Sequence, residues 1–247
     1  MAKFFALSSQ LLAGSDLHIW CASLNSSLED LSYYTSLLSS DEVVRAERFY
    51  FERDRNHFII GRGLLRTLLG SYLDVEPFQI EFVYGQYGKP ALKAGLYKQV
   101  LEFNMSHSRD FAIYAFGLDR KIGIDLEHVR PMPDMDDFAR QFFSLRENLL
   151  INSLSGKQKE DAFFKTWTCK EAFLKANGNG LTVPINKIET SLESDGSVKL
   201  MSIGRVKEHG EFWYLKVFSP FPGYQAAVAV EGHGRHIVLR QLSDHSL

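Results

Sequence analysis

The chain of 247 residues has few cysteines, no long hydrophobic run and no excess of either charge. Its two cysteines, Cys21 and Cys169, cannot build a disulfide framework and do not show the spacing of a zinc site. No run of about eighteen apolar residues predicts a membrane span. A formal net charge of −2 argues against a dedicated nucleic-acid-binding protein. These absences favour a globular cytoplasmic protein that binds neither nucleic acid nor membrane.

Helix and strand patterns are both clear in the sequence. Residues 54–72 repeat large apolar side chains at helical spacing, and so does the segment around Trp167, which ends at Asn177-Gly178. Capping boxes at Ser39-Ser40-Asp41-Glu42 and Ser144-Leu145-Arg146-Glu147 predict two further helix starts. Strands are predicted at residues 80–84, 101–105, 111–116, 122–127, 188–192, 197–201, 212–218, 224–230 and 236–239.

Helices followed by strands occur twice along the chain. This order is typical of an α+β fold in which each half packs its helices on its own sheet. We predict an N-terminal subdomain of residues 1–119 and a C-terminal subdomain of residues 123–247, with residues 120–122 as a short connection. The sequence identity between the two halves is too slight to establish a repeat from the residues alone.

The segment Ile122-Gly123-Ile124-Asp125-Leu126-Glu127 places two carboxylates on one predicted strand. Because side chains alternate along a strand, Asp125 and Glu127 point the same way while Ile124 and Leu126 pack on the other side. Neighbouring carboxylates repel each other and raise each other's pKa unless a cation lies between them. Hard oxygen ligands of this kind suit Mg²⁺. The alternative is the solvated end of an exposed strand, which often carries such a pair.

A second charged motif lies in Trp167-Thr168-Cys169-Lys170-Glu171-Ala172-Phe173-Leu174-Lys175. Glu171 and Lys175 are four residues apart, so they share one face of a helix. An isolated pair of this spacing is usually an exposed ion pair worth a few tenths of a kcal/mol. Beside Asp125 and Glu127, however, Glu171 would supply a third oxygen ligand, and Lys175 a partner for phosphate.

The order of these motifs resembles the 4′-phosphopantetheinyl transferases of the surfactin-synthetase-activating (Sfp) type. The likeness runs from about Arg45 to Leu181. It includes three further segments, Tyr87-Gly88-Lys89-Pro90, Phe103-Asn104-Met105-Ser106-His107-Ser108, and Arg140-Gln141-Phe142-Phe143-Ser144 with Glu147 behind it. The resemblance implies a pseudo-dimer of two similar α+β subdomains with the active site in the cleft between them. It also implies a monomer.

The activity implied by the resemblance is transfer of the 4′-phosphopantetheine arm of coenzyme A to a serine of an apo acyl- or peptidyl-carrier protein. Adenosine 3′,5′-bisphosphate would leave. Mg²⁺, or Mn²⁺ in its place, would bind Asp125, Glu127 and Glu171. The base would be Glu171 itself or a metal-bound water, and the catalytic set would be Glu171, Lys175 and Asp125. The coenzyme would contact Arg45, Gly88, Lys89, Pro90, Ser106, His107 and Lys175.

For several basic residues and one cysteine, the sequence allows two interpretations. Lys170 matches the family motif but lies one residue off the Glu171 face, so it is either a supporting charge or a direct contact. Cys169 as a nucleophile with His107 as its base would need a local signature that the sequence lacks. Spaced arginines on helices are usually solvated, and this alternative applies to Arg45, Arg48, Arg62 and Arg66. Glu42 stands where the surfactin-type member has a lysine.

Two other classes of protein remain open from the residues alone. A metal-dependent pyrophosphate hydrolase could use the same carboxylates and lysine, but it would attack with water, and the chain lacks a dense glutamate helix. A non-catalytic adaptor could keep the fold, but it would not need all of Asp125, Glu127, Glu171 and Lys175. Neither the sequence nor the resemblance identifies the carrier protein or its pathway.

Overall fold

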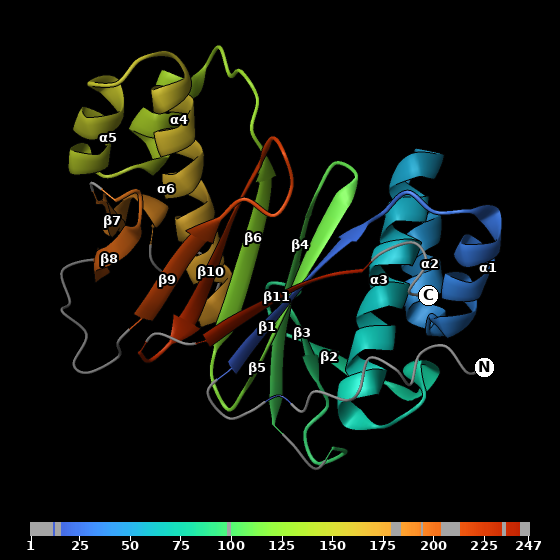
Figure 1. Cartoon of the computed structure of the whole chain (residues 1–247). Helices are drawn as coiled ribbons and strands as arrows, with labels where there is room; N and C mark the ends of the chain where they lie inside the picture. Colours follow the sequence, from blue (N-terminus) through green and yellow to red (C-terminus); the bar gives the residue numbers. More distant parts are fainter. Residues whose placement is uncertain are drawn as a thin grey trace.

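Two sheets pack face to face between two layers of helices in this computed structural model (Figure 1). The structure describes residues 12, 16–97, 100–178, 184–193, 195–203, 213–233 and 236–242. The end of the family-like segment, at Gly180 and Leu181, lies outside these residues. In the described part the fold is a mixture of helices and strands, as predicted.

The described helices are α1 (Leu28–Leu37), α2 (Ser40–Glu47), α3 (Glu52–Leu73), α4 (Met135–Phe142), α5 (Leu145–Asn152) and α6 (Gly156–Asn177), with 3₁₀ turns η2 (Pro77–Gln79) and η3 (Ile185–Lys187). The described strands are β1 (Asp16–Ser23), β2 (Phe82–Tyr84), β3 (Pro90–Leu92), β4 (Leu101–Ser108), β5 (Phe111–Leu118), β6 (Ile122–His128), β7 (Ile188–Leu192), β8 (Val198–Ile203), β9 (Trp213–Phe218), β10 (Tyr224–Glu231) and β11 (His236–Gln241).

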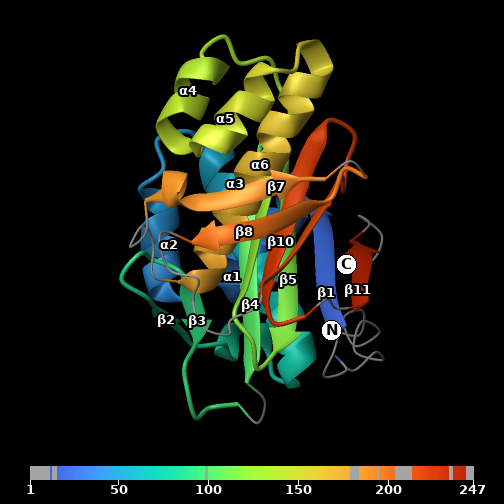
Figure 2. The ribbon, with the colours of Figure 1, turned by 90° about the vertical axis from the view of Figure 1, so that its left-hand side faces the viewer.

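The two main sheets take their strands from different halves of the chain, with β11 as the one exception among the described strands. The first has the strand order β11-β1-β5-β4, and the second has the order β6-β10-β9. All their pairs are antiparallel apart from β11, which pairs in parallel with β1. Figure 2 shows this late strand beside the first one. The predicted C-terminal subdomain therefore gives its last strand to the N-terminal sheet, and the boundary at residues 120–122 stays a prediction.

Strand alternation divides the interior into successive cores. On β5, Tyr114 and Phe116 pack in the core beneath α3, whereas Ile113 packs in the core between the sheets. On β6, Ile124 and Leu126 enter that same inter-sheet core, as their spacing predicted. The opposite face of the second sheet packs against α6. One alternating strand therefore serves two cores, and β6 is left with Asp125 and Glu127 on its α6 side.

Most predicted elements are confirmed, with shifts at their ends. Both capping boxes begin helices, at α2 and α5. The long helix predicted at residues 54–72 starts two residues earlier, at Glu52. The strand predicted at residues 80–84 is shorter because η2 and its cap precede it. The N-terminal elements β1 and α1 lie in a region where the sequence showed no motif.

Helix α6 lies so close to β6 that only glycine fits between them. A Cβ atom built on Gly123 would be 2.0 Å from the Ala172 carbonyl oxygen and 2.3 Å from the Ala176 nitrogen. Both are backbone atoms of a helix, so neither can turn aside as a side chain would. Within the described ranges, no helix is long and apolar enough to cross a membrane.

Replacing Gly123 with alanine is therefore expected to destabilise the protein by about 3 kcal/mol or more, since the added methyl must push α6 from the sheet. Urea unfolding of the purified variant would measure this. Gly61, buried in α3, is the matched control because a Cβ there meets only ordinary contacts at 3.6 Å or more. Gly61→Ala should be neutral or slightly stabilising. Equal midpoints for Gly123→Ala and wild type would contradict the proposed close packing.

Candidate active site

Strands β4 and β6 are edge strands of different sheets, and side chains of β4 bridge them. Asn104 Oδ1 accepts a hydrogen bond from the Ile124 N–H at 2.8 Å. Two residues along, Ser106 Oγ accepts from the Leu126 N–H at 3.3 Å. The next alternate pair repeats the pattern, with Ser108 Oγ accepting from the His128 N–H at 3.1 Å. These three side chains take the place of a backbone ladder, and we call them the β4–β6 bridge.

Ser106 also belongs to a charged network in which Asp125 is buried and Lys175 is partly exposed. Its hydroxyl donates to Asp125 Oδ1 at 3.1 Å and accepts from Lys175 Nζ at 2.9 Å. Lys175 Nζ lies 2.6 Å from the same Asp125 oxygen. Three residues that the sequence assigned to the site, from β4, β6 and α6, therefore meet in one network. Asp125 is only 4% exposed, so this network lies in a medium where charge interactions are strong.

Glu127 and Glu171 both interact electrostatically with Asp125. Burial raises the pKa of Glu127, and the negative charge of Asp125 raises it further. The same two causes, in the same order, raise the pKa of Glu171. Trp167 Nε1 donates to Glu127 Oε1 at 3.3 Å, so this tryptophan orients a carboxylate as well as packing in the core. The three predicted acids thus share one electrostatic environment.

The donor set fits a hard divalent cation, although the side chains do not already surround one. Asp125 Oδ2 is buried and has no hydrogen-bond partner, a costly condition that a cation would relieve. Carboxylate oxygens are the ligands that Mg²⁺ prefers. Among the residues described, no group of three His, Cys, Asp or Glu side chains is arranged to hold a metal ion as it stands. Binding would therefore require Glu127 or Glu171 to turn toward Asp125.

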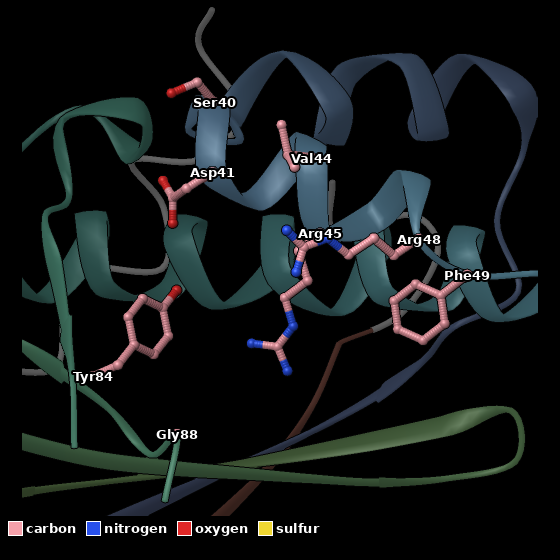
Figure 3. A pocket seen from close by; sticks show the side chains of 8 residues that line it. All are labelled: Ser40, Asp41, Val44, Arg45, Arg48, Phe49, Tyr84 and Gly88. Atoms are coloured by element: carbon pink, nitrogen blue, oxygen red, sulfur yellow. The ribbon is translucent and has the colours of Figure 1, made fainter. Parts of the chain in front are cut away.

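A pocket of about 800 Å³ lies between α2 and the turn that joins β2 to β3 (Figure 3). Arg45 and Gly88, both predicted to bind the coenzyme, line it together with Arg48. The close-up shows the two arginine side chains next to each other, with Arg45 reaching toward Gly88. The remaining lining residues are Ser40, Asp41, Val44, Phe49 and Tyr84. The structure thus places Arg45 and Gly88 at a basic pocket, separate from the carboxylates on β6 and α6.

Lys89, Pro90 and His107 lie outside the pocket lining. Lys89 Nζ donates to the Ile122 carbonyl oxygen at 3.0 Å, and Pro90 begins β3. Burial lowers the pKa of Lys89 to about 8, against the opposing effect of the Glu102 carboxylate. His107 is the residue after Ser106 on β4. Burial lowers the pKa of the His107 imidazole, and the positive charge of Lys175 lowers it further.

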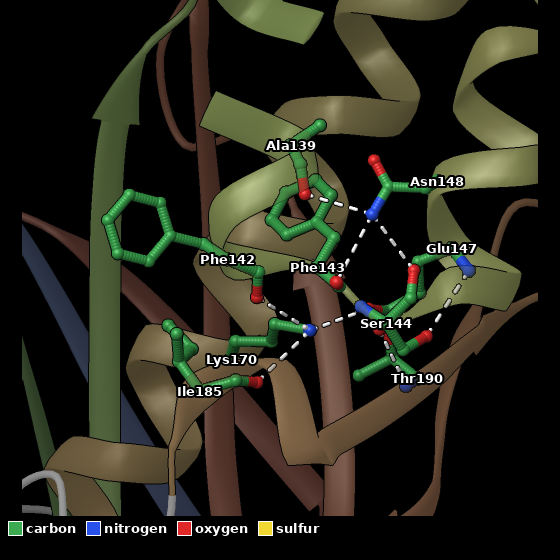
Figure 4. Close-up of polar contacts among 9 residues, drawn as sticks. All are labelled: Ala139, Phe142, Phe143, Ser144, Glu147, Asn148, Lys170, Ile185 and Thr190. Atoms are coloured by element: carbon green, nitrogen blue, oxygen red, sulfur yellow. Dashed lines mark hydrogen bonds and ion pairs between the residues drawn. The ribbon is translucent and has the colours of Figure 1, made fainter. Parts of the chain in front are cut away.

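Lys170 is a supporting charge, because its contacts are with buried groups of the protein itself (Figure 4). Its side chain is fully buried, and Nζ lies 2.5 Å from Glu147 Oε2. The same ammonium group donates to the carbonyl oxygens of Phe142 and Ile185. Glu147 is held in turn by hydrogen bonds from Thr190. This lysine therefore fixes α6 against its neighbours and is not a direct contact of the candidate site.

Cys169 and the buried arginines also have structural roles. The Cys169 side chain is 0% exposed, and burial raises the pKa of its thiol, so it cannot act as a nucleophile. Arg66 Nε lies 2.7 Å and Arg62 Nε 3.5 Å from Glu42, and all three residues are buried. From the sequence, one interpretation of these two arginines was that they lie on solvent-exposed helix faces. Sequence spacing also missed the roles of Asn104 and Ser108, although both lie in a segment singled out by its motif.

Comparisons with known proteins match both halves of the chain. Residues 121–229 match the family described as the 4′-phosphopantetheinyl transferase superfamily, and residues 22–117 match the 4′-phosphopantetheinyl transferase N-terminal family. The holo-(acyl-carrier-protein) synthase of Bacillus anthracis, solved with coenzyme A, is 22% identical and covers 45% of this chain and 94% of its own, with a TM-score of 0.39. A score this low carries no weight for the whole fold.

Two relatives are similar over most of their length. The 4′-phosphopantetheinyl transferase HetI of Nostoc sp. is 42% identical over 223 residues, covering 90% of this chain and 91% of the relative. The 4′-phosphopantetheinyl transferase Sfp of Bacillus subtilis is 30% identical over 202 residues, covering 82% and 86%. The chain is therefore an enzyme that belongs to the 4′-phosphopantetheinyl transferase family, of the Sfp type.

Proposed function

We propose that this enzyme moves the 4′-phosphopantetheine arm of coenzyme A to a serine hydroxyl of an apo acyl- or peptidyl-carrier protein. The observation that supports this best is the network of Ser106, Asp125 and Lys175, beside two carboxylates whose pKa values are raised. It places the ammonium group of Lys175, which can bind phosphate, beside carboxylate oxygens that can bind a metal ion. Adenosine 3′,5′-bisphosphate is the leaving group in this proposal.

Asp125, Glu127 and Glu171 would hold Mg²⁺, or Mn²⁺ in its place. Bound there, the ion would neutralise charge on the pyrophosphate and on the departing phosphate oxygen. Lys175 belongs to the same step. Its ammonium group lies between Asp125 and Ser106 and is partly exposed, so it can donate to a phosphate oxygen without leaving the site.

Glu171 is the proposed base for the serine proton of the carrier. Burial and the charge of Asp125 raise the pKa of this carboxyl, which makes it a stronger base than an exposed glutamate as long as no cation is bound to it. A bound water can relay the same proton if the carboxylate is occupied by the metal. The attacking hydroxyl comes from the carrier, so the enzyme needs no nucleophile of its own, consistent with the inert Cys169.

The nucleotide end of coenzyme A would lie toward the basic pocket. Arg45 and Gly88 line that pocket, while Lys89, Pro90 and His107 would complete the contacts. A pseudo-dimer, with residues 1–119 and 123–247 as its halves and the site between them, suits this arrangement. Helices α3 and α6, each of 22 residues, cover the outer faces of the two sheets and support the relation between the halves. We further propose that the enzyme acts as a monomer.

The first test is the mass of a purified apo carrier protein after incubation with coenzyme A, Mg²⁺ and the enzyme. The wild-type enzyme should increase the mass of the carrier by one 4′-phosphopantetheine group. Asp125→Ala should lower the rate on the order of a thousandfold, because it removes the central oxygen ligand. The Asp137→Ala variant is the control, since this exposed acid pairs with Arg140 at the surface.

Circular dichroism should show both variants folded, which separates lost chemistry from lost structure. Near-normal transfer by folded Asp125→Ala would remove the carboxylate site from the mechanism. A wild-type enzyme that hydrolyses coenzyme A and leaves the carrier unmodified would instead favour the hydrolase class. A protein that binds the carrier and changes neither molecule would favour the adaptor class.

A second prediction uses the pKa of Lys89, which is about 8. Below this pH the amine is charged and can pair with a phosphate, and above it the amine becomes neutral. The kcat/KM for coenzyme A should therefore fall as pH rises through about 8, because this ratio reports ionisations of the free enzyme. Lys89→Arg, whose charge persists, should flatten the fall.

Lys89→Ala provides the complementary control. It should bind coenzyme A more weakly at pH 7 and show no further loss between pH 7 and pH 9. The carrier must be held at saturation, so that only the coenzyme term varies. An alkaline fall that is unchanged in both variants would mean that another group titrates, and that Lys89 does not contact the coenzyme.

A further inference from the structure

Three side chains on β1 and α3 form a hydrogen-bonded group that the proposed mechanism does not use. Trp20 Nε1 donates to the Tyr72 hydroxyl oxygen at 2.8 Å, and the same oxygen lies 2.7 Å from His18 Nδ1. His18 is 2% exposed and Trp20 is 4% exposed. Strand β5 separates β1 from the β4 residues of the candidate site. We call His18, Trp20 and Tyr72 the β1–α3 triad.

The direction of these hydrogen bonds makes His18 neutral. An indole N–H can only donate, so the Tyr72 oxygen accepts from Trp20. Burial raises the pKa of Tyr72 to about 12, so its hydroxyl keeps a proton that it can donate in turn. His18 Nδ1 is the acceptor within reach of that proton. Each group of the triad then has a partner when the imidazole carries its own proton on Nε2.

The C-terminal strand β11 packs beside this triad at the edge of the first sheet (Figure 2). It pairs in parallel with β1, with Val238 opposite His18 and Arg240 opposite Trp20. The guanidinium carbon of Arg240 lies 5.1 Å from the centre of the Trp20 ring. Among the described strands, β11 pairs with β1 and with no other. Its place in the sheet therefore depends on β1.

A proton added to His18 would break the pattern of partners in the triad. Nδ1 would then carry a hydrogen, so the Tyr72 hydroxyl would lose the acceptor for its own proton. A buried donor without a partner is costly. The imidazole would also gain a positive charge at a position that is 2% exposed, and burying a charge costs more still.

The charged groups that face His18 come from β1 and β11. Burial lowers the pKa of His18 most, Arg240 lowers it next, and His236 lowers it further. Asp16 on β1 acts in the opposite direction and raises it. From α3 the facing group is the uncharged Tyr72, and β5 has no charged residue. A protonated His18 would therefore be repelled by β11, chiefly at Arg240.

We propose that the β1–α3 triad is an acid-sensitive switch, which releases β11 from the first sheet when His18 takes up a proton. The new charge repels Arg240, and the new proton on Nδ1 takes away the acceptor of Tyr72. At the other end of β11, His236 lies 3.6 Å from Asp16, and protonation of His236 strengthens that contact. Release therefore begins at the Arg240 end. This inference goes beyond the transfer reaction and does not depend on it.

The switch operates below pH 6.5. The pKa of His18 in the folded protein is lower than its ordinary value of 6.5, so a state that exposes His18 binds a proton more readily. The stabilisation that neutral His18 gives to the paired strands is complete above about pH 6.5. It is lost as the pH falls from there toward the lowered pKa.

Hydrogen exchange of the full-length enzyme, followed by mass spectrometry, tests the switch. Between pH 7.5 and pH 5.5, residues 236–241 should lose protection about tenfold after correction for the intrinsic exchange rate. Strand β5 should keep its protection, because it pairs with β1 and β4 in the middle of the sheet. A wild-type enzyme whose β11 is equally protected at both pH values would overturn the proposal. So would a β5 that loses as much protection as β11.

Two variants identify the group that titrates. His18→Asn places an amide oxygen where Nδ1 can accept from Tyr72, but it cannot take up a proton, so β11 should stay protected at pH 5.5. His236→Asn is the matched control, because it removes the 75% exposed histidine of the same strand pair and should leave the acid-induced loss in place. A loss in His18→Asn as large as in wild type would show that another group is responsible.

A measurement on the wild-type enzyme decides the question even if His18→Asn does not fold. The indole N–H of Trp20 donates to Tyr72, so its ¹H–¹⁵N NMR signal reports on the triad. This signal should shift with a midpoint below pH 6.5 that coincides with the loss of β11 protection. An unchanged signal, or a midpoint separate from that loss, would overturn the proposal. Both measurements are made without coenzyme or carrier, so their outcome is independent of the proposed function.

Discussion

The β4–β6 bridge is the constraint on which the geometry of this enzyme depends. Edge strands leave backbone N–H groups without partners, and burying such groups is costly. Here Asn104, Ser106 and Ser108 satisfy the N–H groups of alternate β6 residues with side-chain oxygens. Each bond is worth only about 1 kcal/mol. Their combined effect is positional, because a repeated pattern fixes the register of two strands from different sheets. Ser106 keeps enough hydrogen-bonding capacity to hold Asp125 and Lys175 as well.

Helix α6 is fixed against this frame at two points. The absence of a side chain at Gly123 lets the backbone of α6 approach β6 at Ala172 and Ala176. On another face of the helix, Lys170 forms a buried ion pair with Glu147. Breaking one side of a buried pair typically costs about 3–5 kcal/mol, so this contact strongly opposes rotation of the helix. Glu171, next along the chain, is therefore held on the carboxylate side.

The sequence predicted those parts of the site that follow from local periodicity. The common direction of Asp125 and Glu127 follows from strand alternation, and the helical spacing of Glu171 and Lys175 puts them on one face. Roles that depend on distant partners could not be predicted in this way. Lys170 and Glu147 are 23 residues apart in sequence, and both are buried because helices α5 and α6 pack together. Nothing in the sequence alone distinguishes Asn104 as a partner for the Ile124 backbone.

The basic residues show why charge in a sequence does not reveal its use. Arg62, Arg66 and Lys170 look like ordinary helix-surface cations, yet each is buried and lies within 4.0 Å of a carboxylate. These cations stabilise the fold through ion pairs, because burying an unpaired charge in the interior is costly. Arg45 and Arg48 are exposed at a pocket and have no such partner among the described residues. Lys175 is intermediate, since it is paired with Asp125 but 31% exposed. Burial and pairing together, and not charge alone, therefore separate the cations that stabilise this protein from those free to meet a phosphate.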